Sequence, residues 1–378
     1  MSAGSDAETG RDFMVRRDDP SQTRFAPAAL APLAENEVVL SVDRFAFTAN
    51  NITYATFGER MSYWKFFPAP EGFGRIPVWG YGTVLRSQSE DVREGERFYG
   101  YFPMSTHLVV QPVRAGTAGF SDGVAHRAEL HPLYNQYSRT SADPLYDAGR
   151  EPQTMLLRPL FVTSFVIDDL LGDNAFYGAD AVLLSSASSK TAWGVAFLLA
   201  ERKRRGEPTP QIIGLTSPRN VAYVERLGFY DRVVPYAEVA ELPKNLRVAY
   251  VDFAGDRALL ASLHLHFGEG VRYSSSVGYA HNAPLPAARP SAPALPGAAP
   301  TVFFAPDQIR KRNAEWGPGG FAARFADAWH AVVVPASDPA KNWLRIDEAR
   351  GEDAVERVYR EALGGRLQPD LGNILSLT

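Results

Sequence analysis

One segment, residues 179–194, constrains the fold more than any other part of the chain. It opens with the apolar run 181–184, passes through small residues, and continues with Val195, Leu198 and Leu199 at helical spacing. This order predicts a strand, a tight turn and a helix whose N-terminal N–H groups can receive an anion. Segments of this kind hold the diphosphate of a dinucleotide.

The usual glycine fingerprint of such turns, G-x-G-x-x-G, is altered. Ser186, Ser189 and Ala192 stand where its three glycines would be. Small side chains still let a phosphate approach the backbone, and hydroxyl and amine groups add donors. The predicted cofactor-binding residues of the turn are Ser186, Ser188, Ser189, Lys190 and Thr191. The alternative is an ordinary strand–helix turn with a serine-rich cap.

Strands and helices alternate after this turn. The further predicted strands are 211–216, 232–236, 248–255, 271–278 and 301–306. Gly228 is expected to end the helix that Ser217 opens. The rhythm predicts an α/β fold with a Rossmann-type, doubly wound parallel sheet. Such sheets bind ligands outside the carboxyl ends of their strands, where Ser276 and Phe304 are further candidates.

Residues 182–192 resemble the "VLVTGASGGVG" segment of the zinc-independent medium-chain dehydrogenases/reductases, on the quinone oxidoreductase and enoyl reductase side of that superfamily. The similarity covers most of residues 35–280, although residues 113–155 and 283–345 match poorly. Further matching segments, in family order, are 37–51, 78–85, 93–102, 106–112, 214–220, 226–236 and 251–255. The resemblance implies a divergent branch of the superfamily, with a β-rich, GroES-like catalytic domain beside the nucleotide-binding domain.

The expected organisation follows from this resemblance and from composition. Residues 1–24 mix charged and small residues and are predicted to be a flexible tail. The catalytic domain is expected at 25–159 and 336–378, and the nucleotide-binding domain at 160–335. Residues 113–155 are predicted to be an insertion. The Pro- and Ala-rich stretch 282–300 is predicted to be a loop, either a lid or an inert surface excursion.

The resemblance implies a site for hydride transfer, in which the protein positions and polarises the acceptor. Asn50, Asn51 and Tyr54 are the candidate catalytic residues, because Asn can donate to a carbonyl and Tyr can donate a proton. The alternative is a turn at Asn50 and Asn51 and a core role for Tyr54. Thr163 resembles a threonine beside the nicotinamide, or is a threonine on the surface of a helix.

NADP(H) is the expected cofactor. NAD-binding sheets often carry an acidic residue after the second strand, but here Ser217 and Arg219 follow it. Both could bind a 2′-phosphate through charge-assisted hydrogen bonds. The lysine common in the family is Asn220 here, which shifts the expected contact to Arg219. Tyr236, after the third strand, is a further candidate.

Composition limits the other classes of site and partner. The chain has 378 residues, 45% hydrophobic, no cysteine and a formal net charge of −4. We expect no metal, because cysteine ligands are absent and Trp79-Gly-Tyr occupies the Gly-His-Glu region of the zinc enzymes. No nucleic acid and no membrane are expected as partners. The expected partner is a small-molecule substrate, the expected location is the cytoplasm, and a homodimer stays open.

These observations together predict a zinc-independent NADP(H)-dependent reductase acting on an enone, quinone or ketone. Two alternatives remain: a redox-neutral reaction with tightly held nicotinamide, and a catalytically silent ligand-binding protein that keeps the fold. The missing glycines favour the silent protein, whereas Lys190 and Arg219 argue against it.

Overall fold

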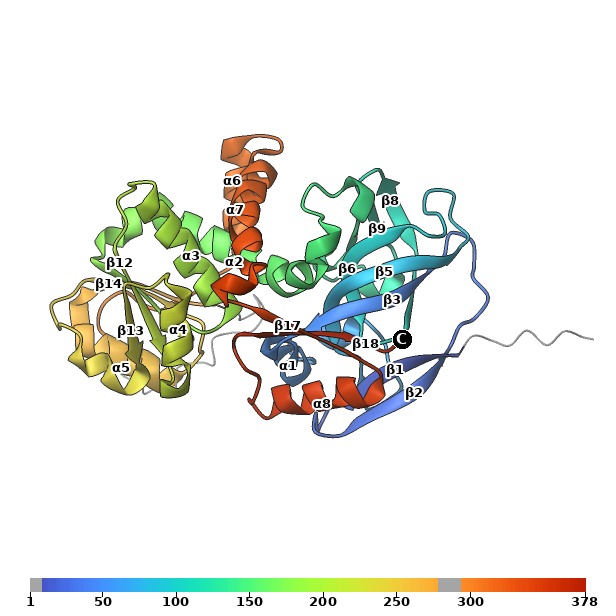
Figure 1. Ribbon diagram of the computed structural model, residues 1–378, viewed down its shortest axis with the longest axis horizontal. Coiled ribbons are helices and arrows are strands. Elements are labelled where there is room, and N and C mark those ends of the chain that lie inside the picture. Colours follow the sequence, from blue (N-terminus) through green and yellow to red (C-terminus); the bar gives the residue numbers. More distant parts are fainter. Residues whose placement is uncertain (1–8, 278–293) are drawn as a thin grey trace, which may run out of the picture. The chain divides into compact units, whose positions relative to one another are not determined.

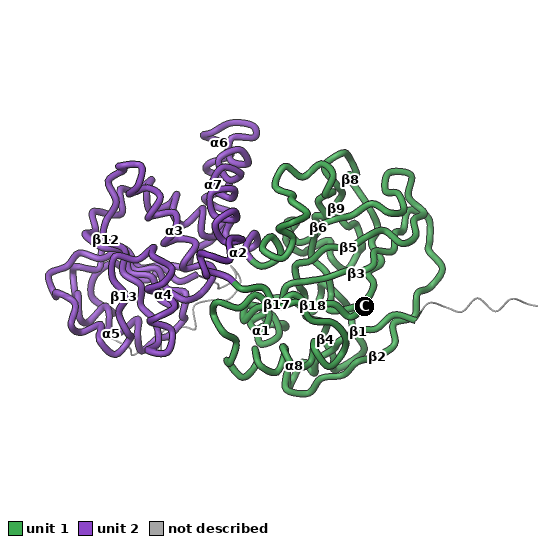
Figure 2. Tube along the Cα trace, viewed as in Figure 1, with its two compact units in different colours: residues 1–156, 345–378 green, residues 157–344 purple. Residues whose placement is uncertain are grey.

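The computed structural model describes residues 9–277 and 294–378. The chain forms two compact units, which Figure 2 shows in different colours. Unit 1 comprises Met1–Leu156 and Arg345–Thr378, and unit 2 comprises Leu157–Leu344. The chain thus returns to unit 1 later than the sequence-based boundary at 335/336. Helix α2 (Glu151–Asp173) carries the chain from the first unit to the second.

Unit 2 contains a six-stranded parallel sheet in the order β13-β12-β11-β14-β15-β16. Figure 1 shows part of this sheet, with β12, β13 and β14 labelled. The strands are β11 (Ala181–Leu184), β12 (Gln211–Thr216), β13 (Arg232–Pro235), β14 (Val248–Asp252), β15 (Val271–Ser276) and β16 (Thr301–Val302). This order is that of the doubly wound dinucleotide-binding sheet. The predicted parallel sheet is therefore confirmed. Its strand order reverses between β11 and β14, which makes the carboxyl ends of these two strands the expected ligand crevice.

The helices of unit 2 begin and end where local chemistry favours it. Those after α2 are α3 (Lys190–Arg204), α4 (Val221–Leu227), α5 (Arg257–Phe267), α6 (Ala305–Trp316) and α7 (Gly320–Ala336). Gly228 ends α4 with φ +72°, in the left-handed region that glycine adopts without strain. Asp256 caps α5 by accepting the N–H groups of Ala258 and Leu259.

The sixth predicted strand, 301–306, is too long. The strand β16 ends at Val302, and helix α6 has begun by Ala305. Pro306 lies in the first turn of that helix, where its missing N–H costs nothing and its fixed φ suits the helix. Phe304 is consequently the residue just before α6.

Unit 1 is built of antiparallel sheets that carry an aromatic core. Its strands are β1 (Thr9–Arg16), β2 (Thr23–Ala29), β3 (Val38–Phe47), β4 (Phe73–Gly74), β5 (Pro77–Ser87), β6 (Arg97–Pro103), β7 (His107–Val110), β8 (Pro112–Gly116), β9 (Gly119–Asp122), β10 (Gln136–Arg139), β17 (Arg345–Arg350) and β18 (Leu371–Ser376). Its helices are α1 (Ala49–Thr56) and α8 (Glu352–Leu363). Among the strands of unit 1 that the structure describes, only β17 and β18 pair in parallel.

The prediction of a flexible tail over residues 1–24 is wrong for the part that the structure describes. Strand β1 pairs antiparallel with β2, and Phe13 and Val15 are fully buried. The ring of Phe13 lies 5.2 Å from that of Tyr359 in α8. The apolar core of this strand is only Phe13, Met14 and Val15, so the polar composition around it conceals it. Residues 1–8 and 278–293 lie outside the described residues, and so does most of the predicted loop 282–300.

The predicted insertion at 113–155 holds a buried arginine. Arg127 is 1% exposed, and its guanidinium donates to Asp122 (2.9 Å), Asn135 (2.9 Å) and the Tyr137 hydroxyl (3.1 Å). The same side chain donates to the Tyr134 carbonyl. Because a buried charge needs a partner for each donor, this cluster fixes how the segment folds over β6, β9 and β10.

Candidate functional site

The turn after β11 has the geometry of a dinucleotide-binding turn without its glycines. Ser186 adopts φ +49°, the left-handed conformation that a glycine normally takes. Its N–H donates to the hydroxyl of Tyr236, 3.0 Å away. Ser189 caps α3, because its hydroxyl accepts the N–H of Ala192 (3.3 Å). The serines therefore build the turn, and the contact with Tyr236 supports an unfavourable backbone conformation.

The first two βα turns of the sheet are joined by a side-chain contact. The Asn220 amide donates to the hydroxyl of Ser188, 3.0 Å away. Ser217 and Arg219 lie in the same short segment as Asn220, which follows β12. Arg219 is exposed, whereas Ser188 is buried. The residues predicted to bind the diphosphate and those predicted to read the 2′-phosphate are thus held together by a residue that replaces the family's lysine.

Close packing of α3 depends on a glycine that the altered fingerprint did not include. A Cβ built on Gly194 would lie 2.6 Å from the hydroxyl oxygen of Ser164 in α2. That hydroxyl donates to the carbonyl of Thr191 (2.8 Å), in the first turn of α3. Thr163, the predicted neighbour of the nicotinamide, precedes Ser164 and is partly buried. The close approach of α3 to α2 therefore occurs at Gly194, two residues after Ala192, the residue at the third glycine position of the fingerprint.

Asp252 was not among the predicted site residues. It ends β14 and is 2% exposed. Its Oδ1 accepts the hydroxyl of Ser185, 2.8 Å away, at the end of β11. The aspartate stands in the family-like segment 251–255, so the resemblance contained a signal for it. The chemistry of the residue alone did not, because its partner Ser185 follows a different strand, 67 residues away in the chain.

Ser276, another predicted cofactor residue, lies at the same edge of the sheet, and so does Thr216, which was not predicted to bind the cofactor. Ser276 ends β15 opposite Asp252 in the register of the two strands, and it is 4% exposed. Thr216 ends β12, is 1% exposed, and its hydroxyl has no hydrogen-bond partner among the described residues. An orphaned buried hydroxyl beside Ser217 fits a site that a polar ligand completes.

The candidate catalytic residues Asn50, Asn51 and Tyr54 belong to α1 in unit 1. Asn51 is 5% exposed; its oxygen accepts the Thr48 N–H (2.8 Å), and its amide donates to the Pro77 carbonyl (2.9 Å). This side chain therefore caps the helix and ties it to β5. Asn50 instead donates to the hydroxyl of Tyr54, 2.7 Å away. The two asparagines thus have different partners, as adjacent residues of one turn must.

Tyr54 lies in a cluster of aromatic side chains. Its ring is 4.3 Å from that of Tyr63 and 6.3 Å from that of Tyr101. Tyr134, from the insertion, packs 4.9 Å from Tyr101. Burial raises the pKa of Tyr54, and the neighbouring Tyr134 raises it further. A phenol in this environment stays protonated at neutral pH and can act as a proton donor but not as a base.

Comparison with known proteins places the chain in a family. Residues 45–368 match the model of a family described as "Protein of unknown function (DUF2855)". The chain belongs to the DUF2855 family. No curated protein matches it by sequence.

Solved structures show which fold this DUF2855 member shares. CurA from Vibrio vulnificus, in complex with NADPH, has a TM-score of 0.60 at 13% identity, over 97% of this chain and 99% of that chain. YhdH from E. coli K-12, with bound NADPH, has a TM-score of 0.54 at 15% identity, over 97% and 100%. A putative NADPH:quinone reductase from Bacillus thuringiensis has a TM-score of 0.52 at 12% identity, over 97% and 98%.

These likenesses confirm the resemblance to the medium-chain dehydrogenases/reductases at the level of the fold. The Rossmann-type sheet and the β-rich, GroES-like architecture expected for the catalytic domain are both present in this DUF2855 member.

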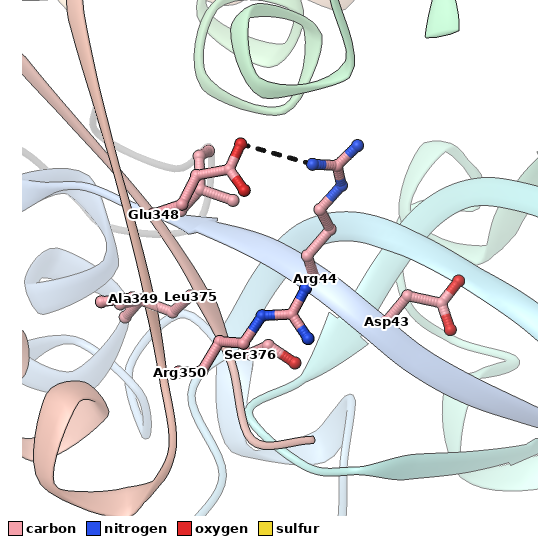
Figure 3. A pocket seen from close by; sticks show the side chains of 8 residues that line it. Asp43, Arg44, Glu348, Ala349, Arg350, Leu375 and Ser376 are labelled. Carbon is pink, nitrogen blue, oxygen red and sulfur yellow. Dashed lines mark hydrogen bonds and ion pairs between the residues drawn. The ribbon is translucent and has the colours of Figure 1, made fainter.

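A small hollow in unit 1 contains none of the predicted site residues. It lies along β3, β17 and β18 and is lined among others by Asp43, Arg44, Glu348 and Arg350 (Figure 3). Arg44 spans it to Glu348 (3.4 Å) and also donates to the buried Glu151 (2.6 Å). Charges of both signs line it, and the arginine at its centre is already paired with carboxylates. This arrangement favours a structural role.

Two further results concern only residues 9–277 and 294–378. In this part of the DUF2855 chain, no three His, Cys, Asp or Glu side chains are grouped so that they could hold a metal ion. Nor does any helix there combine the length and the apolar character needed to cross a membrane. The absence of zinc remains a prediction, which elemental analysis would test.

Proposed function

We propose that this protein is an NADP(H)-dependent reductase that acts on an enone, quinone or ketone without zinc. The observation that carries the proposal is the turn Ser185–Ser189, which has the strand–turn–helix geometry of a phosphate-binding turn at the switch point of a six-stranded sheet. Two proteins of the same fold, CurA and YhdH, have crystal structures with NADPH bound.

The residues at this edge of the sheet fit the cofactor. Helix α3 offers its N-terminus to the diphosphate, and Lys190 and Arg219 bring positive charge to the two turns. The Thr216 hydroxyl has no protein partner in the described structure, which suits a ligand-binding edge. Tyr236 would act by holding Ser186, since its hydroxyl already accepts that residue's N–H. When bound, NADPH supplies the hydride.

For the acceptor, we assign the proton donor to Tyr54. Asn50 donates to the Tyr54 hydroxyl oxygen, which leaves the phenolic proton for another acceptor such as a carbonyl oxygen. Asn51 has a capping role and is the weaker candidate. A cytoplasmic location is also part of the proposal and rests on the sequence alone, and a homodimer stays open.

The proposal predicts that the purified protein binds NADPH with a dissociation constant on the order of micromolar. The serine-built turn keeps the helix N-terminus available, so the missing glycines should not abolish binding. Isothermal titration calorimetry with NADPH and NADH measures this directly. If neither dinucleotide binds at millimolar concentration, the protein is a silent member of the fold. If NADPH binds, its oxidation in the presence of ketones, enones and quinones identifies the substrate class.

Arg219→Asp should weaken NADPH binding much more than NADH binding. Loss of a charge-assisted contact to phosphate costs about 1.5–3 kcal/mol, or about ten- to hundred-fold in affinity, and the new carboxylate adds repulsion. The matched control is Arg310→Asp in α6, where the exposed arginine is ion-paired with Asp307. Equal losses for both cofactors would show that Arg219 does not recognise the 2′-phosphate.

A further inference from the structure

The carboxyl ends of β11 and β14 are linked by a buried pair of side chains. Ser185 is 0% exposed and donates its hydroxyl proton to Asp252 Oδ1 over 2.8 Å. These are the two strands between which the order of the sheet reverses. The pair therefore lies at the switch point, where doubly wound sheets bind their ligands.

The same two side chains also organise the segment that follows β14. The Ser185 oxygen accepts the N–H groups of Phe253 (2.8 Å) and Ala254 (3.1 Å). Asp252 Oδ1 accepts those of Ala254 (3.0 Å) and Gly255 (3.1 Å). One serine and one carboxylate thus fix the backbone of residues 253–255 relative to the turn Ser185–Ser189.

Because Ser185 and Asp252 are buried, their polar groups need hydrogen-bond partners within the protein. Asp252 is 2% exposed, so its charge is stabilised by the donors around it, which include the Tyr250 hydroxyl at 3.0 Å. A carboxylate so close to a turn that would receive a diphosphate brings unfavourable charge. Helix capping and sheet pairing do not require it there, because β11 and β14 also pair through their backbones. What the carboxylate adds is a fixed geometry between two loops.

We infer that Asp252 is a positioning residue for the dinucleotide, acting through Ser185. The two side chains hold the turn Ser185–Ser189 and residues 253–255 as one preformed surface, so that the cofactor does not have to order two loops when it binds. This inference rests on the proposed function, because the ligand it concerns is NADPH.

The test compares NADPH affinity among variants, at a temperature where circular dichroism shows each to be folded. Ser185→Ala should weaken NADPH binding about ten- to hundred-fold, because the hydroxyl that joins the two loops is lost. Ser185→Thr keeps a hydroxyl and should restore most of the affinity. Asp252→Asn should also weaken NADPH binding. The double variant Ser185→Ala/Asp252→Asn should have about the same NADPH affinity as the weaker-binding single variant, because both changes break the same hydrogen bond.

Ser274→Ala is the matched control. It removes a buried hydrogen bond of 3.0 Å between Ser274 in β15 and His264 in α5, a contact that involves neither Ser185 nor Asp252. It should lower the melting temperature and leave NADPH affinity within about two-fold of the original. If Asp252 had a purely structural role, Ser185→Ala and Asp252→Asn would behave like this control: the melting temperature would fall and the NADPH affinity would stay within about two-fold of the original. That result would overturn the inference.

A measurement on the unaltered protein covers the case in which the variants do not fold. NADPH should slow amide hydrogen exchange in residues 253–255 together with the turn Ser185–Ser189. Protection of the turn alone contradicts the inference and leaves the proposed function intact. Failure of the unaltered protein to bind NADPH contradicts the proposed function itself, so the two failures are distinguishable.

Discussion

Tyr54→Phe should lower kcat by about 10²- to 10⁴-fold, the range for a positioned proton donor, and leave NADPH affinity nearly unchanged. Phenylalanine keeps the ring that packs 4.3 Å from Tyr63, so a core role would survive the change. The phenolic proton is absent from phenylalanine, so a role as proton donor would be lost. Steady-state kinetics with an accepted substrate, together with calorimetric titration of NADPH, measure the two effects separately.

Three further variants separate the phenol from its surroundings. Tyr63→Phe removes a neighbouring hydroxyl and should change kcat much less than Tyr54→Phe. Asn50→Ala should lower kcat modestly, because its amide orients the Tyr54 hydroxyl from 2.7 Å. Asn51→Ala should instead lower the melting temperature, because the cap of α1 and the bond to Pro77 are lost. Wild-type turnover in Tyr54→Phe would move the proton donor elsewhere.

The pH profile provides an independent check on the same residue. Burial raises the pKa of Tyr54 above the ordinary value of about 10 for a tyrosine. The donor form is the protonated form, so it persists as the pH rises through 10. The rate should therefore show no loss assignable to this phenol up to that pH. A decline with a midpoint below 10 would indicate that a different group donates the proton.

Arg127→Met should destabilise the protein by about 3–5 kcal/mol, the usual result of breaking a buried ion pair from one side. Asp122, which is 4% exposed, would lose the guanidinium of Arg127 as its partner. The hydrogen bonds from Arg127 to Asn135 and Tyr137 would also be lost. Urea unfolding followed by circular dichroism measures the loss.

The control for Arg127 is an exposed ion pair. Arg16→Met breaks the pair with Asp18 at the surface and should leave the urea midpoint unchanged, because water screens that contact. The double variant Arg127→Met/Asp122→Asn should recover part of the loss, since it removes the stranded charge. A change no larger than that of Arg16→Met would show that the Arg127 cluster contributes little to stability.

Local pattern was sufficient for the sheet of unit 2. The strand Ala181–Leu184 is a purely apolar run bounded by a turn signal, and strands buried on both faces have this composition. Gly228 ended its helix as predicted, because the left-handed conformation it adopts favours glycine. The same reasoning failed at β1, where three apolar residues in a polar segment give too weak a signal. It also failed at 301–306, where a helix with Pro306 in its first turn begins at Ala305.

The sequence by itself determined the strand–turn–helix units, the parallel arrangement of their strands and the serine-rich turn. These features depend on residues close together in the chain. Only the tertiary structure decided which polar groups satisfy one another. Asn51 became the donor to the Pro77 carbonyl, Tyr236 the partner of the Ser186 N–H, and Asp252 the acceptor for Ser185. Such pairings depend on distances between strands and helices far apart in the sequence. A buried donor takes whichever acceptor the fold brings within about 3 Å of it.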